Sequence, residues 1–172
     1  IKDVPYKTLR KILSDTKKRK DLRKKLKTLE IDKDNPLKGI LLIQMFEKSS
    51  LRTRLSFYLA IRQLGGSALT LRPDELHLSK GGESLSDTAK ILSTYGDIFV
   101  LRTDNEKKLN SFKKFLSIPL INGLSPNSHP AQILSDIFTI EEITKKNISK
   151  LNICWIGDSN NVLNSLIEAS IK

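Results

Sequence analysis

Cysteine is nearly absent from this sequence: Cys154 is the only one among 172 residues. A single thiol excludes a disulfide within the chain and a zinc site built from several cysteines. Because nothing indicates an oxidising compartment, we expect a cytoplasmic protein. Cys154 lies in the apolar segment KLNICWIGD, so we expect it to be a buried residue of a strand rather than a reactive thiol.

Long apolar runs are absent as well. No stretch approaches the ~20 apolar residues that a membrane-spanning helix needs, and no charged segment followed by an apolar one opens the chain as a signal peptide would. The chain starts at Ile1 without a methionine and ends in NSLIEASIK, which has the pattern of a helix. We therefore expect no membrane partner, and we expect the chain to be part of a longer protein.

Acidic residues are few compared with basic ones, 19 against 30, and the net charge of +11 predicts attraction to anions. Phosphorylated metabolites, nucleic acids and anionic lipids all fit that charge. Eight of the eleven residues from 17 to 27 are basic, and the only apolar stripe there is formed by Leu22, Leu26 and Leu29. No aromatic residue interrupts the charges, so a solvent-exposed surface helix is favoured over a patch that binds nucleic acid.

What the sequence does contain is a regular alternation of strand and helix patterns. Short apolar runs bounded by turn residues predict strands at 39–46, 67–71, 97–102, 118–123 and 150–159. Helical spacing of apolar residues predicts helices at 4–15, 17–30, 55–64, 84–96, 110–116, 129–144 and 161–170. Alternation of this kind predicts an α/β fold in which a parallel sheet is sandwiched by helices. In such sheets, ligands bind at the carboxyl ends of the strands.

The segment SSLRTR, residues 49–54, lies where the first predicted strand ends and the next helix begins. Backbone N–H groups at a helix start and the helix dipole both favour an anion. Arg52 adds a guanidinium fork for phosphate, Thr53 a hydroxyl donor, and Ser50 a cap or a second donor. The alternative is an ordinary capped helix start with two solvated arginines, and this pattern alone leaves both interpretations open.

Two other predicted strands also end in polar side chains of a suitable kind. Arg102 closes the third strand, and His129 and Gln132 follow the fourth. Each of these residues alone is typical of an ordinary surface or turn position. Because the ends of parallel strands meet at one edge, we expect them to converge on one ligand that carries a phosphate near Arg52 and a polarisable carbonyl near His129.

Several motifs in order resemble the carbamoyltransferase family: FEKSSLRTRLSF, GGESLSDTAKILSTYGD and HPAQILSD. The segments INGLSP and GDSNNVLNS are similar to the ornithine branch of that family, and the resemblance runs from about Pro36 to Ser170. It implies a carbamoyl-phosphate-binding domain at 1–140 and the first strand and helix of an ornithine-binding α/β domain at 141–172. It also implies the reaction of carbamoyl phosphate with ornithine to give citrulline and phosphate, without metal or cofactor, in a homotrimer.

The resemblance implies a role for each matching residue. Ser50, Arg52, Thr53 and the backbone N–H of Leu51 would hold the phosphate, and Arg54 would brace the loop or contact the phosphate more distantly. Arg102 would bridge the phosphate and carbamoyl oxygens, and His129 and Gln132 would hold the carbamoyl group, with His129 polarising its carbonyl. Asn161 would bind the α-amino and α-carboxylate end of ornithine.

The sequence also departs from the family pattern. Leu51 stands where the family usually has a threonine, Ala131 where it commonly has cysteine or threonine, and the loop DELHLSKGGE lacks a glutamine that many members lend to a neighbouring subunit. His77 and Lys80 are the candidates to replace that glutamine. The family's later ornithine-binding Asp, Ser-Met-Gly and His-Cys-Leu-Pro segments are not in this chain. We therefore expect the chain to bind carbamoyl phosphate without turnover, and we keep acetylornithine, putrescine and aspartate as alternative amine substrates.

Overall fold

The structure is a computed structural model that describes residues 1–76 and 82–172. The chain divides into two compact units, a sheet unit of residues 26–125 and a helical unit formed by residues 1–25 and 126–172. The predicted domain limits, 1–140 and 141–172, concern the domains of the family and stay a prediction. Each unit is described separately below.

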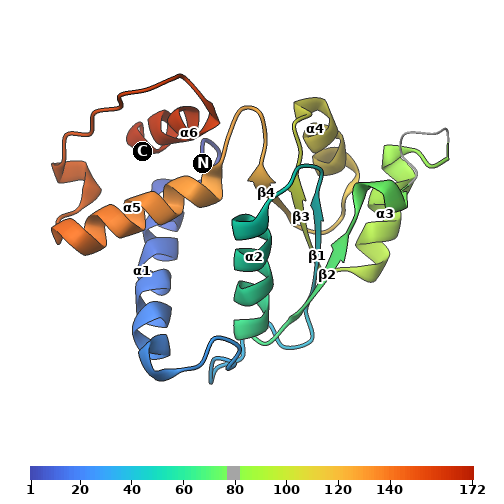
Figure 1. The fold of residues 1–172 in the computed structure, drawn as a ribbon, viewed down its shortest axis with the longest axis horizontal. Helices are drawn as coiled ribbons and strands as arrows, with labels where there is room; N and C mark the ends of the chain where they lie inside the picture. Colours follow the sequence, from blue (N-terminus) through green and yellow to red (C-terminus); the bar gives the residue numbers. More distant parts are fainter. Residues whose placement is uncertain (77–81) are drawn as a thin grey trace. The chain divides into compact units, whose positions relative to one another are not determined.

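The sheet unit contains four parallel strands, labelled in Figure 1. They are β1 (Leu41–Phe46), β2 (Ser67–Leu71), β3 (Ile98–Arg102) and β4 (Leu120–Leu124), in the spatial order β2-β1-β3-β4. The predicted parallel α/β fold is thereby confirmed. Since all four strands run the same way, their carboxyl ends meet at one edge of the sheet.

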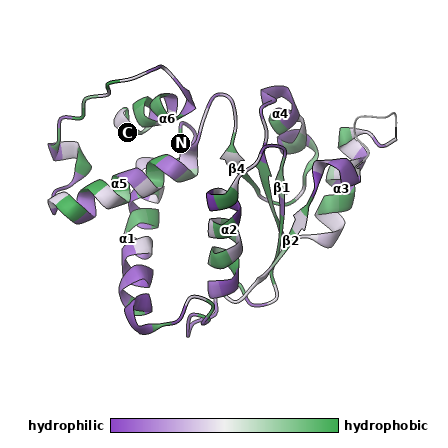
Figure 2. Cartoon of the chain, viewed as in Figure 1, coloured by the Kyte–Doolittle hydropathy of each residue, from purple (hydrophilic) through white to green (hydrophobic). Residues whose placement is uncertain are grey.

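Helices cover both faces of this sheet (Figure 1). Helix α2 (Leu51–Gln63) packs on one face through Ile61, against Leu42 and Val100. Helices α3 (Leu85–Tyr95) and α4 (Glu106–Phe115) pack on the other face, which is the larger apolar cluster. That cluster contains Ile43, Met45, Ala89, Leu92, Phe99, Leu101, Leu109 and Phe112. Successive strand residues point to opposite faces, so a strand covered on both faces requires a mainly apolar run. The central strands β1 and β3 are of this kind, and much of the sheet is green in Figure 2.

Glycine ends α2 where the sequence predicts it. The helix stops at Gln63, Gly65 adopts a left-handed φ of 93°, and the N–H of Gly66 donates to the carbonyl of Ile61 at 2.9 Å. Glycine adopts this conformation without the steric cost that a side chain would bring. The chain thereby turns directly into β2.

The helical unit is built from α1 (Tyr6–Leu22), α5 (Pro130–Thr144) and α6 (Asn161–Ser170), with 3-10 turns at Arg23–Lys25 and Ile148–Lys150. Its buried centre is formed by Leu13, Ile133 and Ile137. A two-pronged ion pair joins α1 to α5: the Nη1 and Nη2 atoms of Arg10 lie 2.7 and 3.2 Å from the two carboxylate oxygens of Glu141. Burial raises the pKa of Glu141, but the hydrogen bonds from Arg10 and from the Ile148 N–H outweigh it, so that this pKa lies below its ordinary value.

The basic segment 17–27 lies at the surface, as predicted, but its helical limits differ from those expected. The sequence predicts two helices here, at 4–15 and 17–30. The structure has one continuous helix, α1, which runs through the expected break and ends at Leu22. The predicted stripe is not a packing face, because Leu22 and Leu29 are 77% and 58% exposed. Lysine and arginine are good helix formers, so α1 continues through them without needing an apolar partner, and Figure 2 shows its later turns in purple.

The strand predicted at 150–159 was wrong. Residues 151–160 have no regular secondary structure, and Cys154 is exposed rather than buried. A strand needs a neighbouring backbone with which to exchange hydrogen bonds, and no described segment pairs with these residues. Ile156 is accordingly 93% exposed. Helix α6, which follows, was predicted correctly.

No helix in the described part of the chain combines the length and apolar character needed to cross a bilayer.

Candidate functional site

The edge of the sheet where β1 and β3 end carries the predicted phosphate-binding segment. Phe46, the last residue of β1, pairs in register with Arg102, the last residue of β3. Four residues after Phe46, Ser50 immediately precedes α2, whose first residue is Leu51. Residues 49–54 thus lie at a strand end and a helix start, as the sequence predicts.

Arg102 connects the end of β3 to the start of α2. Its Nη1 donates to the hydroxyl of Ser50 at 3.0 Å and lies 3.4 Å from the hydroxyl of Thr53. Its Nε is buried and has no hydrogen-bond partner among the described residues. The structure therefore brings Arg102 together with two other predicted phosphate ligands, Ser50 and Thr53, from which it is about fifty residues away in sequence.

The start of α2 is electropositive. Its first turn carries no acidic residue, and the Ser50 side chain makes no capping hydrogen bond to the described backbone. The N–H groups of a first helical turn have no partners within the helix, and the helix dipole places partial positive charge there. Arg52 and Arg54 in this turn are exposed, and so is Leu51, which contributes a backbone N–H but no hydroxyl. This arrangement suits an anion such as phosphate.

A partly buried ionic network lies directly beside this edge, and sequence reasoning missed it. Glu47 follows β1, and its two carboxylate oxygens accept hydrogen bonds from the Thr103 hydroxyl and the Lys108 ammonium. Thr103 is 1% exposed, and its hydroxyl also accepts from the N–H of Asn105 at 3.1 Å. The available signal was that charged and hydroxyl residues, Glu47 and Thr103, directly follow two apolar strands.

A second ion pair joins the same two turns on the outside. The ammonium of Lys48 lies 3.1 Å from a carboxylate oxygen of Asp104, and both side chains are more than half exposed. The hydrogen bond from Lys48, together with its charge, lowers the pKa of Asp104. This exposed pair contributes little to stability, in contrast to the partly buried network of Glu47.

His129 and Asn161 lie in the helical unit, where a single hydroxyl connects them. His129 is the buried N-cap residue of α5, and its backbone N–H donates to the hydroxyl of Ser165 at 2.8 Å. The same hydroxyl donates to the carbonyl of Asn161 at 3.0 Å. Ser165 is fully buried and was not predicted from the sequence, where it is one of several serines in a helical pattern.

The other predicted residues of the helical unit make local contacts. Gln132 is exposed, and its Nε2 donates to Asp136 at 2.7 Å, one helical turn away. Asn160 rather than Asn161 caps α6, through hydrogen bonds from the N–H groups of Val162 and Leu163.

Two expectations from the sequence stay predictions. The convergence of Arg52 and Arg102 with His129 would join the two units, and it stays a prediction. The candidates for contact with a neighbouring subunit, His77 and Lys80, lie outside the described residues.

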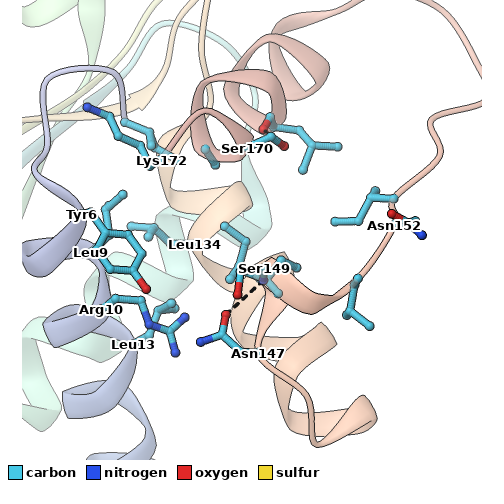
Figure 3. A pocket seen from close by; sticks show the side chains of 17 residues that line it. Tyr6, Leu9, Arg10, Leu13, Leu134, Asn147, Ser149, Asn152, Ser170 and Lys172 are labelled. Atoms are coloured by element: carbon cyan, nitrogen blue, oxygen red, sulfur yellow. Dashed lines mark hydrogen bonds between the residues drawn. The ribbon is translucent and has the colours of Figure 1, made fainter.

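The helical unit also contains a cavity of about 430 Å³, shown in Figure 3. Its walls are largely apolar and include Leu9, Leu13 and Leu134, with Arg10 and Asn147 at its polar side. None of the predicted site residues lines it. In the described part of the chain, no group of three or more His, Cys, Asp or Glu side chains is placed to hold a metal ion.

Comparison with known proteins agrees with this description of the fold. Residues 1–142 match the family model described as "Aspartate/ornithine carbamoyltransferase, carbamoyl-P binding domain". Among curated proteins, the chain is 42% identical over 161 residues to an ornithine carbamoyltransferase of Rhizorhabdus wittichii, covering 94% of this chain and 52% of that protein. It is 40% identical over 171 residues to one of Oleidesulfovibrio alaskensis, covering 99% of this chain and 54% of that protein.

Solved structures show the same similarity. The chain superposes on an ornithine carbamoyltransferase from Pyrococcus furiosus with a TM-score of 0.89 at 37% identity, covering 98% of this chain and 52% of that one. A catalytic subunit of aspartate transcarbamoylase from M. jannaschii superposes with a TM-score of 0.73 at 33% identity, over 85% of this chain and 46% of that one. The chain thus spans about half the length of the curated relatives that it matches.

Proposed function

Because the chain belongs to the aspartate/ornithine carbamoyltransferase family, we propose that it is the carbamoyl-phosphate-binding part of an ornithine carbamoyltransferase. The complete protein would transfer the carbamoyl group of carbamoyl phosphate to the δ-amine of L-ornithine, giving L-citrulline and phosphate. The single observation that carries this proposal is the meeting of Arg102 with Ser50 and Thr53 at the start of α2.

The proposed phosphate site uses the donors at this edge of the sheet. Arg52, Arg102, the hydroxyls of Ser50 and Thr53 and the N–H of Leu51 would surround the phosphate oxygens, and Arg54 would support the loop. In the structure, Arg102 donates to two neutral hydroxyls. A phosphate oxygen is a stronger acceptor for a guanidinium than a hydroxyl is, so the arginine would exchange these partners for the ligand.

The chemistry follows from where charge develops. Attack by the neutral amine builds negative charge on the carbamoyl oxygen and then on the departing phosphate. Arg102, His129 and Gln132 would donate to the first, and Arg52 and Arg102 to the second. Donors that are already in position stabilise this charge more in the transition state than in the ground state, and each is worth about 2.7–4 kcal/mol. As in the family, the reaction would use no metal or cofactor.

The remaining parts of the proposal concern the complete protein. Asn161 would hold the α-amino and α-carboxylate groups of ornithine, and residues 141–172 would begin the ornithine-binding domain. The other residues that bind ornithine would come from a part of the protein outside this chain. The enzyme would act as a homotrimer in the cytoplasm, in arginine metabolism, and without nucleic acid as a partner. The 172-residue chain by itself would bind carbamoyl phosphate without turnover.

Isothermal titration calorimetry with carbamoyl phosphate, or with a stable phosphonate analogue, tests this proposal. The folded chain should bind the ligand, and Arg52→Ala should weaken binding at least tenfold. The matched control is Arg62→Ala, which removes another exposed arginine, in the last turn of the same helix, and should leave the affinity unchanged. Absence of binding by the folded chain, or equal affinity of Arg52→Ala and wild type, would reject the assignment.

A different amine substrate is the second candidate function. Leu51 removes one hydroxyl from the family's phosphate motif, and the aspartate transcarbamoylase structure shares the fold of this chain. Assays of the complete protein with ornithine, acetylornithine, putrescine and aspartate separate these possibilities. Ornithine should be carbamoylated with the highest kcat/KM.

A further inference from the structure

Glu47 lies between the sheet and the proposed phosphate site without being part of either. It directly follows β1 and precedes Ser50 by three residues. Its backbone N–H donates to the carbonyl of Arg102 at 3.0 Å, so the main chains of the two strands remain paired beyond the end of β1. The loop that leads to α2 therefore starts from a position fixed relative to Arg102.

The side chain of Glu47 strengthens this connection. Its carboxylate receives one hydrogen bond from Thr103, the residue after Arg102, and another from Lys108 in the first turns of α4. The side chains of Glu47 and Lys108 are only 14% and 25% exposed. Ion pairs withdrawn from water lose little strength to solvent screening, and removing one partner leaves the other charge poorly solvated. The network thus holds the β1–α2 loop against the β3–α4 turn.

The proposed phosphate donors lie on the two segments that this network joins. Ser50 belongs to the β1–α2 loop and Arg102 immediately precedes Thr103. Their side chains meet at 3.0 Å, and in the described part of the chain the Glu47 carboxylate forms a hydrogen bond or ion pair with neither of them. Lys108 also neutralises the carboxylate of Glu47, which would otherwise repel a phosphate dianion nearby.

We propose that Glu47 is a positioning residue that holds Ser50 and the start of α2 against Arg102, so that the phosphate donors are preorganised before the ligand binds. This inference rests on the proposed function of the strand-end site. In this inference, Thr103 and Lys108 anchor Glu47, and none of these three residues contacts the ligand. Preorganised donors give higher affinity because less ordering is needed on binding.

The test compares variants of the full 172-residue chain by calorimetry with carbamoyl phosphate and by chemical denaturation. Glu47→Ala should weaken binding about tenfold or more. Glu47→Gln, which keeps the shape and one acceptor for Thr103, should bind between Glu47→Ala and wild type. Lys108→Met should weaken binding severalfold, and Lys108→Arg, which restores the ion pair, should return the affinity to within about twofold of wild type.

Two controls separate positioning from a general loss of stability. Asp104→Asn breaks the exposed ion pair between the same two turns and should leave the affinity within about twofold of wild type. Leu92→Ala removes a buried side chain from the α3 face and should lower stability without changing the affinity. If Leu92→Ala weakens binding as much as Glu47→Ala at equal loss of stability, the positioning role is refuted.

The outcomes also distinguish this inference from the proposed function. If the wild-type chain binds carbamoyl phosphate and Arg52→Ala does not, the proposed phosphate site is supported. If, in that case, Glu47→Gln and Lys108→Met both bind as tightly as wild type, only the positioning role of Glu47 is refuted. If the wild-type chain fails to bind, the proposed function is rejected and the inference falls with it. Glu47→Gln serves as the decisive variant if Glu47→Ala does not fold.

Discussion

Replacing Arg102 by methionine is expected to abolish most of the affinity for carbamoyl phosphate while leaving the fold intact. Methionine matches the aliphatic part of the arginine side chain, so the packing at the end of β3 is largely kept. What is lost is the guanidinium, whose Nη1 lies 3.0 Å from the Ser50 hydroxyl and 3.4 Å from that of Thr53. The perturbation is therefore confined to the charge and to its hydrogen bonds.

The magnitude follows from those contacts. In the free protein, the substitution removes hydrogen bonds to the hydroxyls of partly exposed residues. It also removes the Nε of Arg102, which is buried without a hydrogen-bond partner among the described residues, and this offsets part of the loss. The free energy of unfolding should therefore change by no more than about 1 kcal/mol. In the complex, a hydrogen bond from a charged donor is worth about 1.5–3 kcal/mol, so the dissociation constant should rise roughly 10- to 150-fold.

Calorimetry with carbamoyl phosphate measures the affinity, and urea denaturation measures the stability of the same samples. Arg102→Lys is the informative companion, because it keeps the charge but loses the planar fork and should recover only part of the affinity. Lys113→Met, which removes an exposed basic residue from the last turn of α4, controls for net charge. A dissociation constant for Arg102→Met within twofold of wild type would refute the reasoning.

Three further expectations concern the stability of the two units, each taken by itself. Phe112→Ala should lower the free energy of unfolding by about 3–5 kcal/mol in urea, because Phe112 is fully buried with its ring centroid 5.3 Å from that of Phe99. Ser165→Ala should cost about 1–3 kcal/mol, because it removes the buried acceptor of the His129 N–H, and a stability equal to wild type would contradict this. The pKa of Glu141 is lower in the folded protein than in the unfolded chain. Its ion pair therefore contributes its full stabilisation at pH values above the unfolded-state pKa of Glu141, and this stabilisation is lost as the pH falls through the folded-state pKa. The stability difference between wild type and Glu141→Gln should therefore be largest near neutral pH and shrink in acid, and a difference independent of pH would exclude this linkage.

Local patterns were sufficient to predict the strands of the sheet and most helices. Apolar runs of strand length, helical spacing and the glycine pair after α2 each act over a few residues, so they can be read without knowing the fold. The failures at 17–30 and 150–159 have one cause. A stripe of leucines or an apolar run specifies only what could be buried, and burial or strand pairing requires a partner from elsewhere in the structure.

The sequence by itself determined the order of strands and helices, the excess of positive charge and the kinds of side chain that follow each strand, because these depend on neighbouring residues alone. Only the tertiary structure decided that Arg102 meets Ser50 and Thr53, and that Glu47 is held by Thr103 and Lys108. Those contacts join residues about fifty or more positions apart, and they exist because parallel pairing of β1 with β3 brings the two strand ends to the same edge.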